Sequence, residues 1–334
     1  MKSPITGKEM MLKTDLIEQE FRKEKFDIVY HYYLCEDSGE RFEDEQLTQL
    51  NLNQVYNQFR KKHNLPFPEE IIALREQYGL SASKMSEVLG FGINVYRSYE
   101  NGEIPNSSNA RLIQLTEDPK EFKRLIQLSD VLTGKERERV WAKIDELLLK
   151  GEFDSFDLQN YLMGERTADD RTGYRIPNLR KFTEMVVYFT HETEPWKTKL
   201  NKLLFYADFC HFRKTGLSIS GSRYRAIDMG PVPNNFSSIF EHLAERNEVD
   251  IQYTAFSNGS IGEQFKPYPK RDLEENVFTE DELSTLKEVV AKFGKTKTNE
   301  IIEISHEEDA WKKNFKDGKK LISYIDAFKL KNLQ

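Results

Sequence analysis

The spacing of glycine, serine and apolar residues after position 74 places the strongest constraint on how this chain folds. Ser81 suits the N-cap of a helix, because its hydroxyl can accept a free amide of the first turn. Gly79 suits the end of the preceding helix, and Gly90 and Gly92 bracket the turn into the next one. The apolar residues that would form a shared core are Leu74, Met85, Val88, Leu89, Ile93, Tyr96 and Tyr99. This order of short helices and tight turns predicts a helix-turn-helix.

The predicted helix over residues 93–99 has a polar face that suits the edges of base pairs. Asparagine pairs bidentately with adenine and arginine with guanine in the major groove, so Asn94 and Arg97 are candidate base-reading residues. The candidate DNA contacts are Ser81, Ser83, Asn94, Arg97, Ser98 and Asn101. The alternative is a small helical module that binds protein through the same face.

The charge of this segment is balanced rather than basic. Its cations are Lys84, Arg97 and Arg111, and its anions are Glu87, Glu100 and Glu103. Non-specific affinity for DNA comes mainly from neutralised phosphates, so a single copy is expected to bind weakly. We therefore expect a homodimer that reads two half-sites of an operator.

Length, charge and cysteine content narrow the class of protein. The 334 residues suffice for two or more domains, and the net charge of -7 argues against broad coating of polyanions. The two cysteines, Cys35 and Cys210, exclude a disulfide scaffold and suit a reducing compartment. No apolar run reaches membrane-spanning length, and the first 13 residues lack the apolar segment of a signal peptide. These features predict a soluble, cytoplasmic protein that does not bind membranes.

The N-terminal 60 residues predict a small strand-rich module followed by a helix. Residues 26–34 alternate as a strand does, and residues 47–60 have a helical pattern. Residues 2–7 and 34–40 stand where MqsA-type antitoxins carry two Cys-x-x-Cys knuckles of a zinc ribbon. The segment 90–102 (Gly-Phe-Gly-Ile-Asn-Val-Tyr-Arg-Ser-Tyr-Glu-Asn-Gly) also resembles the recognition segment of that family. This resemblance covers about the first 125 residues and implies a ribbon followed by a DNA-binding domain.

The chain departs from that family at the metal ligands. Three of the four expected cysteines are replaced, by Ser3, Thr6 and Ser38, and Cys35 alone remains. Hydroxyl groups stay protonated near neutral pH and are poor zinc ligands. We therefore predict a ribbon without metal or other cofactor, held together by the packing of Phe26, Val29, Tyr30, Tyr32 and Leu34.

The reader helix departs from the family as well. Asn94 matches the family's base-contacting asparagine, but the arginine expected four residues later falls on Ser98. Arg97 stands one position earlier, which turns it by about 100° around the helix. Ala82 also replaces a glutamine that many related proteins carry. The resemblance therefore implies the docking mode but not the family's operator sequence.

The middle of the chain predicts two further helices and a linker. Asp118 followed by Pro119 is a helix start, and residues 134–150 carry apolar side chains at helical spacing beneath a charged face. The second helix either packs on a neighbour or serves as a dimerisation or partner-docking helix. The main linker is placed at residues 154–171. The predicted domains are residues 1–60, 66–126, a helical connector and linker over 127–171, and 172–334.

The C-terminal part predicts a mostly helical α+β domain with a small antiparallel sheet. Helices are expected over residues 179–190, 196–215, 235–246, 280–293, 298–305 and 306–315. Strands are expected over 223–228, 249–256 and 262–268, with a hairpin at Asn258-Gly259 and a rigid turn at residues 230–233. The whole chain is thus predicted to be multidomain and mainly α with small β elements.

A second resemblance covers most of residues 170–330. The string at residues 199–212 (Lys-Leu-Asn-Lys-Leu-Leu-Phe-Tyr-Ala-Asp-Phe-Cys-His-Phe), then Tyr-Arg-Ala at 224–226 and Gly-Pro-Val-Pro at 230–233, is similar to the Panacea domain of SocA-like antitoxins. It implies a domain that binds and neutralises a toxin encoded beside it. The residues expected to contact the toxin are Tyr206, Asp208, Tyr224, Arg225, Gly230, Pro231 and Val232.

Catalysis has little support in the sequence. None of the six histidines lies in a paired metal-ligand spacing, and no GxSxG or Walker loop occurs. Asp208 and His211 are three residues apart and could share a helix face as a metal edge, an acid–base pair or a plain hydrogen bond. We predict an antitoxin that also represses its own operon, and no enzyme. The alternatives are a ligand-responsive transcriptional regulator without a toxin partner, and an enzyme that uses Asp208 and His211.

Overall fold

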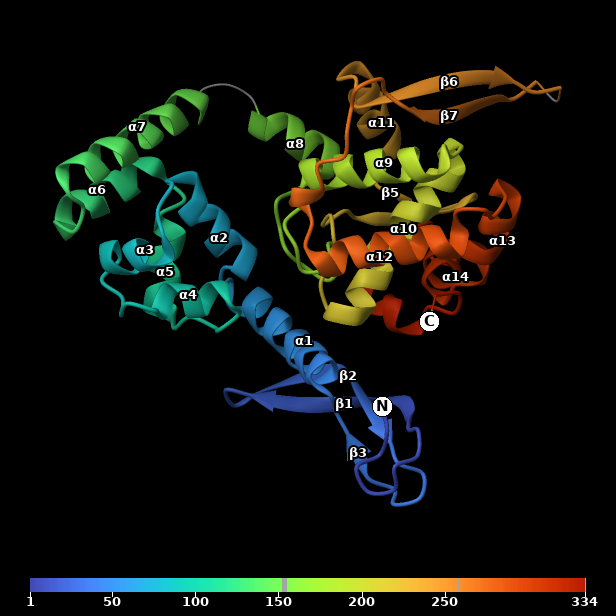
Figure 1. Cartoon of the computed structure of the whole chain (residues 1–334), viewed down its shortest axis with the longest axis horizontal. Coiled ribbons are helices and arrows are strands. Elements are labelled where there is room, and N and C mark those ends of the chain that lie inside the picture. The colour runs from blue at the N-terminus through green and yellow to red at the C-terminus, as the bar shows by residue number, and fades with distance from the viewer. Residues whose placement is uncertain (152–154, 258, 334) are drawn as a thin grey trace. The chain divides into compact units, whose positions relative to one another are not determined.

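The computed structural model describes residues 1–151, 155–257 and 259–333. The chain forms two compact units (Figure 1). The middle unit comprises Tyr56–Leu158, and the terminal unit combines Met1–Val55 with Gln159–Gln334. In the described part of the chain, no helix is both long and apolar enough to cross a membrane. The fold is mixed α/β and mainly helical, with small sheets.

The middle unit is a bundle of short helices. It contains the end of α1 (Glu45–His63), α2 (Pro68–Gln77), α3 (Ala82–Val88), α4 (Val95–Glu100), α5 (Ser107–Leu115), α6 (Pro119–Ser129) and α7 (Gly134–Gly151). The apolar faces of α2 to α7 share one core, in which Met85, Tyr96 and Phe122 are completely buried. The Tyr96 hydroxyl donates to the Ile71 carbonyl (2.7 Å), so this ring enters the core without an unpaired polar atom. Ile93, expected in the core, is instead 69% exposed because it precedes α4 and points outward.

This core extends beyond the predicted boundary at residue 126. Val140 and Ile144 of α7 are buried in it, so α7 packs as an integral helix of the middle unit. The predicted linker over 154–171 is also replaced by structure, because α8 (Ser155–Met163) occupies much of it. Asp154 lies outside the described residues. The predicted connector over 127–171 is therefore divided between the two units rather than forming a segment of its own.

The N-terminal part of the terminal unit is a three-stranded antiparallel sheet in the order β1-β2-β3. Its strands are β1 (Met11–Phe21), β2 (Glu24–Leu34) and β3 (Arg41–Phe42). The turn between β1 and β2 holds Arg22 and Lys23 at positive φ, as a type I′ two-residue turn requires. The predicted strand over 26–34 is β2, and the predicted helix over 47–60 lies within α1. Asn53 of α1 donates to the Thr215 carbonyl (2.8 Å), within the same unit.

The C-terminal part of the terminal unit is built around α10 (Lys197–Thr215), whose residues 199–212 are all buried. The other elements, from α9 to η2, contribute to this part: α9 (Leu179–Thr193), α11 (Phe236–Glu245), η1 (Glu275–Val277), α12 (Glu280–Phe293), α13 (Thr298–Glu307), α14 (Asp309–Lys316) and η2 (Tyr324–Lys329). A second sheet has the order β5-β4-β8, and β6 pairs with β7 alone. These strands are β4 (Tyr224–Ile227), β5 (Gly230–Pro233), β6 (Val249–Ala255), β7 (Ile261–Pro267) and β8 (Leu321–Ile322). The predicted helices and strands therefore recur with small shifts at their ends.

One local prediction in this part is wrong. Residues 230–233 form β5 rather than a turn, and the hairpin turn lies before them at Asp228 and Met229. Two prolines fit this strand because β5 is an edge of its sheet, where missing amide donors interrupt no second ladder. The other predicted hairpin joins β6 and β7, but its Asn258 lies outside the described residues.

Candidate functional site

The first candidate surface is the exposed face of α3 and α4 in the middle unit. Asn94, Arg97 and Asn101 are exposed at positions that share one face of a helix. The Asn94 side chain makes no capping hydrogen bond, so its amide is available to a partner. Ser98 and Ser83 are half-buried, and the exposed Ser81 caps α3 by accepting the Lys84 amide (3.2 Å). Five of these six side chains thus remain for contacts, while the hydroxyl of Ser81 has a structural partner.

Several polar interactions hold α4 on its neighbours. The buried Ser86 hydroxyl accepts the Tyr96 amide (3.0 Å), which ties α3 to the first turn of α4. Arg75 of α2 forms an ion pair with Glu100 of α4 and donates to the Leu80 carbonyl (3.0 Å). The Ser86 hydroxyl therefore has a structural role at this helix crossing. These contacts fix the direction of α4 and hence of its exposed face.

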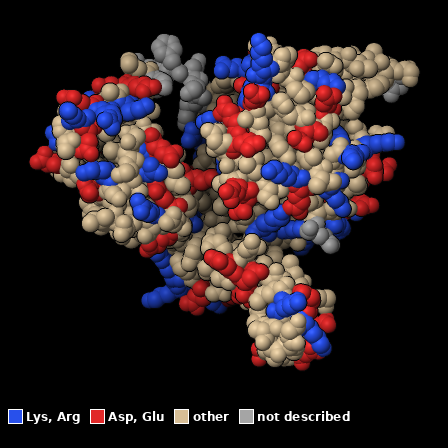
Figure 2. Space-filling model, in the orientation of Figure 1, with Lys and Arg blue, Asp and Glu red and all other residues tan. Residues whose placement is uncertain are grey.

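The ion pairs change the charge that this face presents. Glu100 is paired with Arg75, and Glu87 with Lys84 (3.1 Å). Arg97 forms no ion pair within the described residues and is exposed. On the view in Figure 2, cationic and anionic side chains are interspersed and neither sign forms a broad patch. Arg97 can therefore offer its charge beside neutral amides, which suits base contacts better than a strong general attraction to phosphate.

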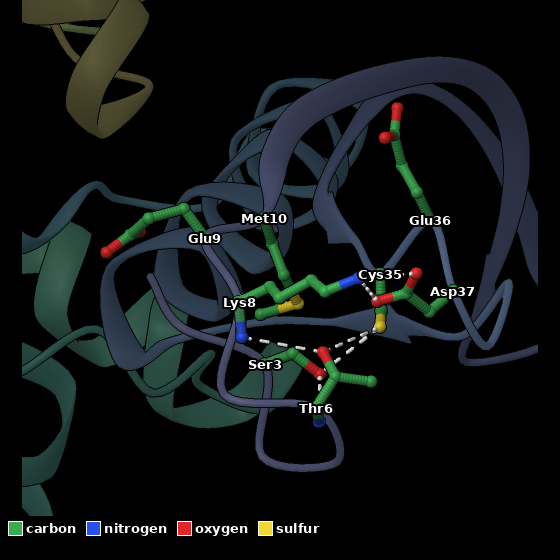
Figure 3. Close-up of a pocket in the computed structure, with 8 residues that line it drawn as sticks. All are labelled: Ser3, Thr6, Lys8, Glu9, Met10, Cys35, Glu36 and Asp37. Atoms are coloured by element: carbon green, nitrogen blue, oxygen red, sulfur yellow. Dashed lines mark hydrogen bonds and ion pairs between the residues drawn. The ribbon is translucent and has the colours of Figure 1, made fainter.

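The N-terminal knuckles come together around Cys35, as Figure 3 shows. The Ser3 hydroxyl donates to the Cys35 sulfur (3.2 Å), and Thr6 Oγ1 lies 3.8 Å from the same atom. Hydrogen bonds from Ser3 and Ser38 lower the pKa of the Cys35 thiol to about 7. The thiol is only 2% exposed and borders a pocket of about 100 Å³.

This site does not fit zinc. One thiol and three hydroxyl groups lack the four thiolate or imidazole ligands of a structural zinc site. Within the described residues, no group of three or more His, Cys, Asp or Glu side chains is placed to hold a metal ion. The absence of zinc stays a prediction. In the structure, the hydroxyl groups hydrogen-bond to the Cys35 sulfur.

In the terminal unit, Asp208 is an internal anchor. Its carboxylate accepts the amides of Ile219 and Ser220 (2.8 Å each). It also accepts the hydroxyls of Ser220 (2.6 Å) and Tyr224 (2.8 Å). Burial raises the pKa of Asp208, and these four hydrogen bonds act in the opposite direction because they favour the carboxylate. The residue therefore fixes the chain after α10 against β4.

His211 lies near other buried charges but is not bonded to Asp208. Its Nδ1 is 3.4 Å from Thr285 Oγ1, whose own proton goes to the Asp281 carbonyl (2.9 Å). Nδ1 therefore carries the proton in this contact. Burial, with the charges of Arg175 and Lys181, holds the pKa of His211 well below its usual range. A neutral histidine with its own partner does not form the acid–base pair that the spacing allowed.

A buried glutamate that the sequence analysis missed organises these charges. Glu282 is completely buried and pairs with Lys181 (2.7 Å) and Arg175 (3.2 Å). It also accepts the Thr279 amide (2.9 Å) in the capping box of α12. The Thr-x-x-Glu pattern before an apolar run was the signal that could have identified it.

The β4–β5 hairpin is clamped by a second missed residue, Lys202 of α10. Lys202 is completely buried and donates to the Pro231 carbonyl (2.9 Å). Burial lowers its pKa to about 7. Gly230 has a φ of +94°, and a Cβ there would lie 2.5 Å from Ser305 Oγ and 2.6 Å from Lys202 Cε. Only glycine fits this position, and Val232 beside it is 3% exposed.

These contacts correct the expected toxin-binding set. Tyr206, Asp208 and Tyr224 have no exposed surface, and Gly230, Pro231 and Val232 are buried. Six of the seven residues therefore build the core, since a buried side chain cannot touch a partner. Arg225 alone is exposed, and it donates to Asn234 Oδ1 (3.3 Å) and to the Lys319 carbonyl (3.2 Å).

Arg225 borders an open hollow of about 460 Å³ with mixed charge. Its charged lining residues are Asp170, Arg171, Arg225, Lys313, Asp317, Lys320 and Asp326. The remaining lining is Asn314, Leu321 and Ser323. A hollow of this kind favours a polar or zwitterionic group over an apolar one, because apolar side chains are almost absent from it.

A second exposed surface is the arm formed by β6 and β7, which extends beyond the helices of its unit in Figure 1. Tyr253 and Ile261 are each 69% exposed, and Phe256 is 44% exposed. Phe256 packs against Trp196 with ring centroids 5.4 Å apart, across the backbone of Gly262. Exposed aromatic and aliphatic groups that cluster on one projecting element are typical of protein-binding surfaces.

Residues 200–312 match the family model of the antitoxin SocA-like Panacea domain. The match covers α10 through the first residues of α14, including the Asp208 anchor, the β4–β5 hairpin and the β6–β7 arm. Over these residues the terminal unit is therefore similar to a domain of an antitoxin family. No curated protein matches the chain.

Proposed function

We propose that this chain is an antitoxin that neutralises a cognate toxin by direct binding through its terminal unit. The observation that supports this proposal is the match of residues 200–312 to an antitoxin domain. The proposal includes no catalytic step, because Asp208 and His211 have separate partners. Neutralisation would follow from covering a functional surface of the toxin.

We assign the toxin contact to the β6–β7 arm. Tyr253, Phe256 and Ile261 supply exposed apolar area within the matched domain. Interface energy concentrates in a few such anchors, at roughly 2 kcal/mol or more each. Arg225 is the one exposed residue among the seven expected toxin contacts. We assign it a polar contact with the toxin at the edge of the terminal unit.

The middle unit is proposed to bind operator DNA and repress the operon. The exposed amides of Asn94 and Asn101 and the exposed guanidinium of Arg97 support this assignment, because they can read base edges. The resemblance to MqsA-type antitoxins supports the same role. Toxin binding and DNA binding then use different units of the chain.

Co-expression with the toxin from the adjacent gene tests this division. A Tyr253→Ala/Ile261→Ala variant is expected to lose growth rescue and to weaken the complex roughly a thousandfold, since two anchors at roughly 2 kcal/mol each sum to about 4 kcal/mol. Asn94→Ala/Arg97→Ala is expected to lose operator binding and keep full rescue. Leu128→Ala is the matched control, because Leu128 is 77% exposed but lies in the middle unit.

Three results would contradict the proposal. Loss of rescue in the reader variant at unchanged protein level would refute the division of labour. Full rescue by the arm variant would refute the assigned surface. Absence of any complex with the adjacent gene product would refute the antitoxin role. In that last case, the hollow beside Arg225 favours the second candidate, a regulator that responds to a small polar ligand.

A further inference from the structure

The N-terminal sheet has one closed edge and one open edge. On the closed edge, side-chain amides of α1 take the place of a further strand beside β2. Gln54 bonds both the amide (2.9 Å) and the carbonyl (2.8 Å) of Val29. Asn51 does the same for His31 (2.9 Å each). On the other side, β1 is the outermost strand of the sheet, and in the described residues it pairs with β2 alone.

These bonds also establish which residues of β1 face outward. In a pair of antiparallel strands, a residue whose N–H and C=O point away from the neighbouring strand stands opposite a residue whose N–H and C=O also point away. The backbone N–H and C=O of Val29 and His31 bond α1 and therefore point away from β1. These two residues stand opposite Leu16 and Thr14, respectively. The amides and carbonyls of Thr14 and Leu16, and by alternation Leu12, therefore lie on the open edge. Leu12 and Leu16 are 54% and 77% exposed.

We propose that β1 pairs with β1 of a second copy of this chain, antiparallel and centred on Thr14, so that two sheets join into one. In this register Leu12 stands opposite Leu16 of the partner, and Lys13 stands opposite Asp15. Each pair occurs twice by symmetry, so apolar groups meet apolar groups and opposite charges meet. The outward residues Leu12, Thr14 and Leu16 supply the hydrogen bonds that such a ladder needs.

Other registers of the same edge are less complementary. If Leu16 lies on the two-fold axis and pairs with its own copy, Leu12 stands opposite Glu20 and Thr14 opposite Glu18. A centre on Glu18 places two glutamates opposite each other, which is unfavourable. A centre on Asp15 places two aspartates directly opposite each other, which is unfavourable for the same reason. The occupant is therefore a second copy of this chain in one specified register, a contact that does not depend on the proposed toxin or DNA binding.

Charge exchange tests the register with the full-length protein. Lys13→Asp sets two carboxylates opposite each other across the interface, and Asp15→Lys sets two ammonium groups opposite each other. Each variant alone is therefore expected to dissociate at least about tenfold more readily than the wild type. An equimolar mixture of the two variants offers a pairing that restores opposite charges and is expected to form a heterodimer. The measurement is sedimentation equilibrium, with circular dichroism to verify folding.

One local effect of these substitutions needs its own control. Asp15 also forms an ion pair with Arg41 (2.9 Å) within the same chain. Recovery of association in the mixture shows that loss of this bridge is not the cause of dissociation, because the mixture does not restore it.

A cross-link provides a second measurement. Thr14→Cys places two thiols across the symmetry axis, where Cα atoms of a hydrogen-bonded pair lie about 5.5 Å apart, within disulfide reach. It is expected to form a covalent dimer on mild oxidation. Glu18→Cys is the control, because its copies would lie about 27 Å apart along the strands. The native Cys35 and Cys210 are buried, so they contribute little background.

A wild-type monomer at tens of micromolar would overturn the proposal. Dimers that persist in both charge variants, or a failure of the mixture to associate, would overturn the register. Equal cross-linking at positions 14 and 18 would do the same. A covalent dimer at position 14 alone, with recovery in the mixture, is the supporting result.

Discussion

Replacing Lys202 with methionine is expected to stabilise the terminal unit at pH 7 and to remove part of its pH dependence. Lys202 is completely buried, and burial lowers its pKa from 10.5 to about 7. Between these two pH values the unfolded chain binds a proton that the folded chain does not. The contribution of Lys202 to stability therefore rises as the pH rises from about 7 to 10.5, and it is lowest below pH 7.

The two pKa values give the magnitude. At about 1.4 kcal/mol per pKa unit, loss of the lysine charge costs about 4 kcal/mol at pH 7 and about 1.5 kcal/mol at pH 9.5. Methionine has a similar volume but no proton to lose. It leaves the Pro231 carbonyl without its donor, at a cost of about 1–3 kcal/mol at either pH. The net effect is stabilisation by about 1–3 kcal/mol at pH 7, and at pH 9.5 a change between about 0.5 kcal/mol of stabilisation and about 1.5 kcal/mol of destabilisation.

Denaturation in urea at the two pH values measures this effect. In a Trp141→Phe background, fluorescence of Trp196 and Trp311 reports the terminal unit, because both remaining tryptophans lie there. At each pH we take the free energy of unfolding of the variant minus that of the wild type. The decisive quantity is how much this difference changes between the two pH values, because the contributions of the other titrating groups cancel in it. It is expected to be about 3 kcal/mol. Lys292→Met, at an exposed position of α12, is the control and should change stability by about 0.5 kcal/mol or less at both pH values.

A pH-independent difference between Lys202→Met and wild type would refute the reasoning. It would mean that Lys202 keeps its proton in the folded chain, and the Pro231 contact would then be a charged hydrogen bond. Destabilisation by several kcal/mol at both pH values would point the same way. Unequal m-values between the variants would mean that the compared transitions expose different surfaces, so equal m-values are part of the expected result.

Three further predictions concern the other sites. A Ser3→Cys/Thr6→Cys/Ser38→Cys variant is expected to bind one zinc ion per chain, because the wild-type hydroxyl groups at these positions already surround the Cys35 thiol. Elemental analysis should find zinc in the variant and none in the wild type. Asp208→Ala should destabilise the terminal unit by about 3–5 kcal/mol, because four buried donors lose their acceptor, and a loss under 1 kcal/mol in urea denaturation would contradict this role. Gly262→Val should disrupt the arm, since a Cβ there would meet two aromatic rings within 2.6 Å, and limited proteolysis should detect the change.

Local elements were predictable because their causes are local. Ser81 and Asp118 cap their helices as expected, each by accepting a backbone amide of the first turn. The apolar alternation of β2 identified that strand. In contrast, β1 was not predicted, because its polar residues hide the period of two and its pairing partner is needed to hold it extended. Residues 230–233 were predicted as a turn because glycine and proline occur in both turns and edge strands.

Site residues were harder to predict than elements. Tyr206, Asp208 and Tyr224 have the chemistry of binding residues, and a resemblance marked their segments as important. Which polar residue is buried depends on what packs over its helix, and every side of α10 between residues 199 and 212 is covered. The same packing buries Lys202 and lowers its pKa, although its sequence neighbours Asn201 and Leu203 give no sign of this.

The amino-acid order was enough to locate helix ends, the short helices of the middle unit and an antitoxin-like domain, because caps, turns and motifs depend on residues close in sequence. Long-range packing set the rest. It assigned α7 to the middle unit and brought Ser3, Thr6 and Cys35 together. It also buried six of the seven expected toxin contacts and left the β6–β7 arm exposed. Burial and charge pairing are properties of neighbours in space, and a single sequence does not specify those neighbours.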